Sequence, residues 1–186
     1  MARLTIDENS DIKALASYWG EGGRESVIEP VLASLKYNVM AGIEKPSRIN
    51  VVALLPPFAR ERLYGHVVNP TTAPDAVKQD CFWTAFNFFS EEPDNRINDF
   101  QYTAQVLQRD YVRVDAPSEL GDLVLVVEPG GKAIHAANYI ADDIVFTKNG
   151  LSPTQPWILG SLKDLVDTYR LKSQSAVELI YFRKRR

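Results

Sequence analysis

The sequence predicts an α+β protein in which helices come first and an antiparallel sheet follows. Up to about residue 110, apolar residues recur at helical spacing. Beyond Pro117 the pattern changes to short apolar, β-branched runs separated by turn signals. A chain of 186 residues has room for one domain with an extension. We therefore expect a helical extension at residues 1–70, packed on a core at residues 71–186.

The extension is expected to hold three helices. The first spans residues 10–19 with Ser10 as its N-cap, and Gly20-Glu21-Gly22-Gly23 breaks it. The second spans residues 27–39 and begins near Pro30, because proline suits the first turn of a helix. The third, residues 58–64, follows a proline pair. Residues 69–74 form a turn-rich linker to the core.

The core is expected to combine three helices with an antiparallel meander. Residues 121–127 form a continuous apolar run typical of a buried strand, and Pro129-Gly130-Gly131-Lys132 is a hairpin turn signal. Asp142-Asp143 marks a second turn. The expected helices are 81–89, 99–109 and 162–169, and the expected strands are 111–114, 121–127, 133–140, 144–148 and 176–182.

Composition excludes several classes of function. The formal net charge is -3 and the pI is near 5.5, so a nucleic-acid partner is not expected. A single cysteine excludes an intrachain disulfide, and two histidines offer no recognisable zinc spacing, so neither a metal nor a cofactor is expected. No apolar run is long enough to span a membrane.

The compartment and the oligomeric state stay open. Residues 1–7 lack the apolar centre of a signal peptide. The protein is therefore expected to be cytoplasmic, or periplasmic or extracellular if a leader has been removed. Nothing in the sequence indicates how many copies assemble.

The single cysteine, Cys81, opens the expected helix 81–89 directly after Asp80. Asp is a preferred N-cap, and the first turn of a helix favours an anion, which depresses the pKa of a thiol toward the reactive thiolate. Phe82, Ala85 and Phe86 give the helix an apolar face. The competing interpretation is that Cys81 is a small buried hydrophobic residue.

His135 lies inside an expected strand, where a polar side chain is unusual. Pairing across the turn at 142–143 brings residues 147–150 opposite 135–138, so Asn149 comes within reach of the imidazole. A cysteine nucleophile needs a base, and the base needs a partner that fixes its tautomer. Alternatively, His135 is a satisfied core residue and Asn149 belongs to an Asn149-Gly150 turn.

These residues resemble the NlpC-like branch of papain-fold cysteine peptidases. The resemblance rests on Asp80-Cys81 opening an aromatic helix, on Gly121-Asp122-Leu123-Val124, and on His135 four residues before Tyr139. It covers residues 77 to about 150. It implies a papain-like core with the cysteine at a helix N-terminus packed on an antiparallel sheet. It also implies a triad of Cys81, His135 and a polar third residue.

The chain departs from that family at two points. Phe82-Trp83 replaces the usual Ser-Gly after the cysteine, so a more crowded and aromatic substrate groove is expected. The third position, often His in the family, is Thr147 or Asn149. We favour Asn149, because an amide oxygen fixes an imidazole better than a hydroxyl does. Asp142 and Asp143 are alternatives that a turn would point toward water.

The expected reaction is hydrolysis of an amide bond in a peptide through a thioester. The resemblance implies that the peptide is of the cell-wall type. The backbone N–H of Cys81 supplies one oxyanion donor, and Gln79 or Tyr64 is the candidate for the second. Trp83 and Trp157 are expected to line a groove. Two other functions stay open: a non-catalytic binding module that uses an aromatic cleft, and an acyltransferase or transglutaminase-like enzyme.

Overall fold

The computed structural model describes residues 2–67, 77–173 and 175–186. It is an α+β structure, as expected, with an antiparallel sheet and helices. The chain divides into two compact units, Met1–Arg60 and Glu61–Arg186. The linker expected at residues 69–74 and the boundary expected at residue 70 lie outside the described residues.

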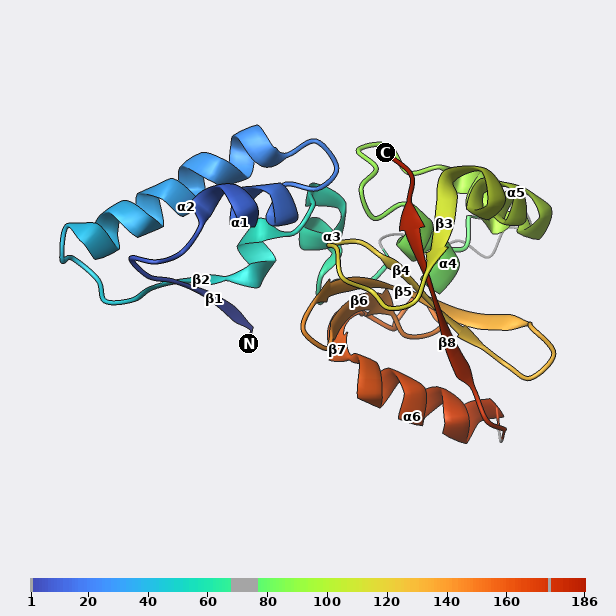
Figure 1. The fold of residues 1–186 in the computed structure, drawn as a ribbon. Helices are drawn as coiled ribbons and strands as arrows, with labels where there is room; N and C mark the ends of the chain where they lie inside the picture. The colour runs from blue at the N-terminus through green and yellow to red at the C-terminus, as the bar shows by residue number, and fades with distance from the viewer. Residues whose placement is uncertain (1, 68–76, 174) are drawn as a thin grey trace. The chain divides into compact units, whose positions relative to one another are not determined.

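The first unit packs two helices against a two-stranded sheet (Figure 1). The sheet pairs β1 (Arg3–Ile6) with β2 (Ser47–Asn50) in antiparallel register, and the helices are α1 (Ile12–Trp19) and α2 (Glu25–Met40). A 3₁₀ turn, η1 (Val51–Leu54), precedes α3 (Pro57–Arg62). The buried apolar side chains of this unit include Ile6, Trp19, Ile28, Leu32, Leu54 and Leu55.

Three details of the first unit differ from expectation. Asp11, not Ser10, is the N-cap of α1, because its carboxylate accepts a hydrogen bond from the backbone N–H of Ala14. The helix α2 begins at Glu25, so Pro30 lies inside it and does not start it. The strands β1 and β2 were not expected, since each is four residues long and pairs with a segment far away in the chain.

The second unit contains a six-stranded antiparallel sheet in the order β3-β8-β4-β5-β6-β7. The expected meander is confirmed as β4, β5 and β6, whereas β7 was not expected. The strands are β3 (Tyr111–Val114), β4 (Leu123–Val127), β5 (Ala133–Ala141), β6 (Ile144–Lys148), β7 (Trp157–Ser161) and β8 (Glu178–Lys184).

Helices cover both faces of this sheet (Figure 1). On one face lie α4 (Cys81–Phe86), the 3₁₀ turn η2 (Asn95–Asn98) and α5 (Phe100–Asp110). On the other lies α6 (Leu162–Ser173). Asn138 of β5 donates to the carbonyl of Ala85 in α4, while its neighbour Ala137 packs with Tyr169 of α6. Successive residues of β5 therefore contact different helices, as strand alternation requires.

Asp122, in the Gly121-Asp122 pair just before β4, connects the loop before that strand to β8. Asp122 is buried and accepts hydrogen bonds from the backbone N–H groups of Ser118 and Glu119. Its carboxylate also forms a two-pronged ion pair with Arg183 of β8, at 2.9 and 2.6 Å. One carboxylate thus fixes the loop before β4 to the neighbouring strand.

Replacing Gly121 by alanine is expected to lower the free energy of unfolding by about 2–5 kcal/mol. Gly121 has a φ of +86°, and an added Cβ would lie 2.2 Å from the ring of Phe89. Gly130 is the matched control, since its φ is +100° but nothing lies within 4 Å of an added Cβ. Gly130→Ala should cost only the backbone strain, about 1–2 kcal/mol. Urea denaturation measures both, and equal losses would contradict this account.

Candidate functional site

The Cys81 thiol lies at the start of α4. Asp80 is the N-cap, and its Oδ1 accepts a hydrogen bond from the backbone N–H of Trp83 at 2.9 Å. Cys81 is the first residue of the helix and is only 7% exposed. The backbone N–H groups of Cys81, Phe82 and Ala136 lie close enough to the sulfur to lower the pKa of the thiol. The start of α4 therefore lies beside Ala136 of β5.

Strands β5 and β6 separate next to Cys81, beyond the pair Asn138–Phe146. Their ladder runs from Asn138–Phe146 to Ala141–Ile144. Before that ladder, the N–H of Ala136 lies close to the Cys81 sulfur, and the carbonyl of Ala136 accepts a hydrogen bond from Thr147 Oγ1 at 3.0 Å. The thiol and the hydroxyl therefore both lie beside the backbone of one residue. The N–H in question belongs to the peptide bond that follows His135.

The His135 ring is fully buried and held on three sides. Its Nε2 lies 2.9 Å from Thr147 Oγ1, and its Nδ1 lies 2.7 Å from the hydroxyl of Tyr169. The ring also stacks on the Tyr169 ring, with 4.4 Å between centroids and an angle of 25°. Within the described ranges, both ring nitrogens thus hydrogen-bond hydroxyl groups and not the Cys81 sulfur.

The protons in this cluster can be assigned by counting. Four contacts share three protons: His135 with Thr147, Thr147 with the Ala136 carbonyl, His135 with Tyr169, and Tyr169 with Asn149 Oδ1. The last contact is the longest, at 3.3 Å, so it is the one left without a proton. Nε2 then donates to Thr147, and Nδ1 accepts from Tyr169. The basic nitrogen is therefore Nδ1.

Burial holds both reactive groups in their neutral forms. Desolvation raises the pKa of the Cys81 thiol to about 11, and Asp80 adds to the rise, although the three backbone N–H groups oppose it. Desolvation, with a smaller contribution from Lys172, lowers the pKa of His135 to about 3. The sequence predicted a depressed thiol pKa. Burial outweighs the helix start, and a neutral thiol and a neutral imidazole result.

The third polar residue beside His135 is Thr147. Asn149, which we favoured, contacts the Tyr169 hydroxyl instead. Continuing the observed register of β5 and β6 would set Asn149 opposite His135, but the ladder ends at Asn138–Phe146. Beyond that pair the two strands separate, and Thr147 of β6, not Asn149, contacts the His135 ring.

The other predicted site residues lie apart from this cluster. Trp83 is 2% exposed, and its indole N–H donates to Asn95 Oδ1; Trp157 is also buried, so neither ring lines an open groove. Tyr64 has an exposed side chain, a φ of 61° and a backbone N–H that donates to the carbonyl of Trp157. Gln79 is half-buried directly before the N-cap.

Two residues near Cys81 were missed by the sequence analysis. Tyr169 comes from α6, and burial raises its pKa above the ordinary value, with Cys81 as a further cause. Lys148 is fully buried at the end of β6, and its ammonium donates to the carbonyls of Gly150 and Ser152. Burial lowers the pKa of Lys148, against the opposing influence of Asp80 and Cys81. The sequence signal for Lys148 was a lysine at the end of an apolar strand.

Comparisons with known proteins do not assign this site. No family model matches the chain, and no curated protein matches it either. Among the described residues, no group of three or more His, Cys, Asp and Glu side chains is arranged to hold a metal ion. In the same part of the chain, no helix is both long and apolar enough to cross a membrane.

Acidification is expected to destabilise the protein through His135. The unfolded chain takes up the proton near pH 6.5, whereas folded His135 does so only near pH 3. The contribution of His135 to the free energy of unfolding is therefore fully present above about pH 6.5. It falls as the pH drops toward 3, by up to about 1.4 kcal/mol per pH unit. Urea denaturation between pH 7 and 4 measures this slope.

The matched variants are His135→Gln, which should flatten that slope, and His66→Gln, which should retain it. His66 is exposed, in contrast to His135. The same slope in both variants would contradict the assignment to His135.

Proposed function

We propose that Glu61–Arg186 is a divergent papain-like cysteine hydrolase of the NlpC-like type that cleaves an amide bond in a peptide. Cys81 is the nucleophile, His135 the base, and Thr147 the residue that orients the imidazole. The observation that carries this proposal is the position of Ala136: its N–H lies close enough to the Cys81 sulfur to lower the thiol pKa, and its carbonyl accepts a hydrogen bond from Thr147. The thiol, the imidazole of the preceding residue and the hydroxyl thus lie around one residue of β5.

The proposed reaction starts from the neutral pair. As the sulfur attacks the amide carbon, the thiol proton passes to the oxygen of Tyr169, whose own hydroxyl proton moves to Nδ1 of His135, and the resulting imidazolium protonates the leaving amine by the same route. Water then cleaves the thioester and releases the acid. Nε2–H keeps its hydrogen bond to Thr147 throughout, which fixes the tautomer in the way that a triad requires.

Positive charge and backbone donors favour the developing oxyanion. The N–H of Cys81 is close enough to its own sulfur to lower the thiol pKa, so it is placed to donate to the oxygen of the attacked carbonyl. The buried ammonium of Lys148 is near enough to Asp80 and Cys81 for their charges to affect its pKa. We assign Lys148 an electrostatic role in place of the second donor expected from Gln79 or Tyr64.

The substrate class follows from the resemblance alone. A peptide with free or D-amino-acid ends, of the cell-wall type, is the first candidate. The crowding expected after the cysteine does not arise from Trp83, because that residue belongs to the core.

Incubation with cell-wall-type peptides, followed by intact-mass measurement, tests the proposal. A thioester adduct should form on the chain and be absent from Cys81→Ala. His135→Gln should lower turnover at least 100-fold, by the size of general-base contributions. The exposed His66→Gln serves as its control and should leave turnover unchanged.

The role of Thr147 is tested separately. Thr147→Val keeps the shape but removes the hydroxyl, so turnover should fall roughly 10-fold or more, while Thr147→Ser should retain most of it. Asn149→Ala should have the smaller effect. If Asn149→Ala proves more harmful than Thr147→Val, the orienting residue is Asn149.

A non-catalytic binding module is the second candidate, favoured by the neutral resting pair. Iodoacetamide labelling of the native protein should be slow at pH 7.5 and speed up toward pH 11, following the raised pKa of the Cys81 thiol. If peptides slow that labelling but form no adduct, the binding module is the better description. Incorporation of an added amine into product would identify an acyltransferase instead.

A further inference from the structure

An apolar cavity of about 470 Å³ lies on the α4 side of the sheet, away from the cluster around His135. Its floor consists of side chains from β4 and β8, and its walls come from α4 and α5. The main apolar contributors are Phe82, Phe86, Leu107, Leu125, Ile180 and Phe182.

The size and lining of this cavity suit an aliphatic chain. An apolar cavity of 150 Å³ accommodates benzene, so one about three times larger has room for a chain of roughly ten carbons or more. Ligand pockets of this size are mostly apolar with a few polar groups at defined points. The cavity is also accessible, because Phe100 lines it while remaining 83% exposed.

The charged groups at the cavity favour an anionic head group. Lys132 lines it from the turn before β5, and in the described part of the chain its ammonium has no ion-pair partner. Asp80 also lines it, but its carboxylate is directed to the backbone of α4 by the hydrogen bond from Trp83. Lys132 is thus the cation available to a ligand.

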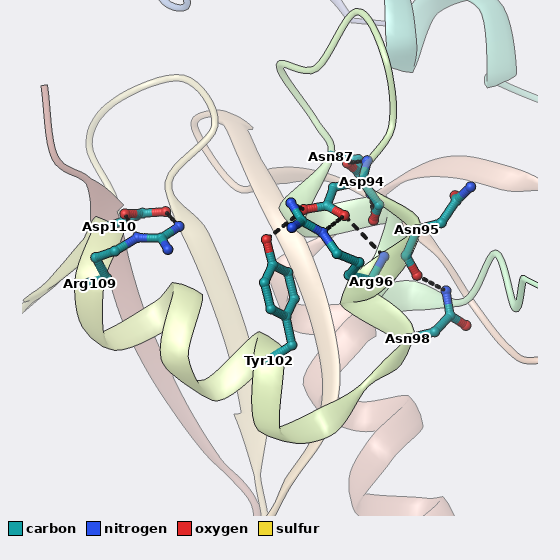
Figure 2. Close-up of polar contacts among 8 residues, drawn as sticks. All are labelled: Asn87, Asp94, Asn95, Arg96, Asn98, Tyr102, Arg109 and Asp110. Atoms are coloured by element: carbon teal, nitrogen blue, oxygen red, sulfur yellow. Dashed lines mark hydrogen bonds and ion pairs between the residues drawn. The ribbon is translucent and has the colours of Figure 1, made fainter.

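The wall on the α5 side is held in place by polar contacts (Figure 2). Asp94 accepts hydrogen bonds from the guanidinium of Arg96 and, at 2.7 Å, from the hydroxyl of Tyr102 on α5. Its backbone N–H donates to Asn87 Oδ1, just after α4. These contacts connect α4, η2 and α5, so the cavity has a pre-formed wall.

We propose that this cavity binds a fatty carboxylate, with the alkyl chain between α4 and α5 and the carboxylate at Lys132. The proposal is independent of catalysis by Cys81. It concerns binding alone and involves no covalent step.

Calorimetric titration with decanoate below its micellar concentration tests this site. The native protein and Cys81→Ala should bind equally well. Ala104→Trp places an indole in the cavity and should weaken binding at least 10-fold. Gln105→Trp, at an exposed position of the same helix, is the matched control and should bind as the native protein does.

The head group is tested with Lys132→Gln, a turn substitution that leaves the cavity lining apolar. It should weaken decanoate binding several-fold but leave binding of decan-1-ol unchanged. The proposal fails if the native protein does not bind decanoate, if Ala104→Trp binds as well as Gln105→Trp, or if Lys132→Gln affects both ligands equally. Because Cys81→Ala is included, loss of turnover and loss of binding are measured separately.

Discussion

The backbone of Ala136 is the point on which the candidate site depends. In a continuous sheet, its N–H and carbonyl would be used by the neighbouring strand. Here the ladder between β5 and β6 ends at Asn138–Phe146; Thr147 donates to the carbonyl instead, and the N–H lies close to the Cys81 sulfur. The local opening of the sheet thus brings the start of a helix into contact with a strand interior. A buried N–H and a buried carbonyl left without partners would be costly, so the side chains stabilise the opening as much as the opening positions them.

Burial has a second consequence for the cluster around His135. The imidazole is enclosed by Thr147, Tyr169 and the strand itself, so its charged form is strongly disfavoured. The same environment keeps the Cys81 thiol protonated. Any chemistry at this site must therefore begin with uncharged groups, and the charge appears only as a bond forms. Lys148 is the nearby buried cation that would favour negative charge at that moment.

Much of the second unit could be predicted from local sequence signals. The β-branched run before the Pro129–Gly131 turn and the Asp142-Asp143 turn fix three adjacent strands, and Asp80 marks the start of α4. Local signals could not reveal β7, which lies in a stretch without alternation and depends on pairing with β6. Nor could they decide between Thr147 and Asn149, because that choice depends on where two strands part.

Tertiary packing explains the remaining differences. Tyr169 lies on α6, 34 residues after His135 in the chain, and no spacing rule in the sequence predicts that the two side chains meet. The pKa of Cys81 was misjudged because a favourable position in a helix was considered without the depth at which that helix lies. The sequence shows that Cys81 lies at the start of a helix, but the burial of that helix start determines whether the thiol is charged.

The strand order carries a consequence for how the second unit is assembled. β8 lies between β3 and β4 and pairs with both, although it comes after every other strand of the sheet. Before residues 178–184 emerge from the ribosome, β3 has no partner and one edge of β4 is bare. Assembly of this sheet is therefore delayed until β8 has been made, and until then the nascent chain exposes an unpaired strand edge that is prone to aggregation.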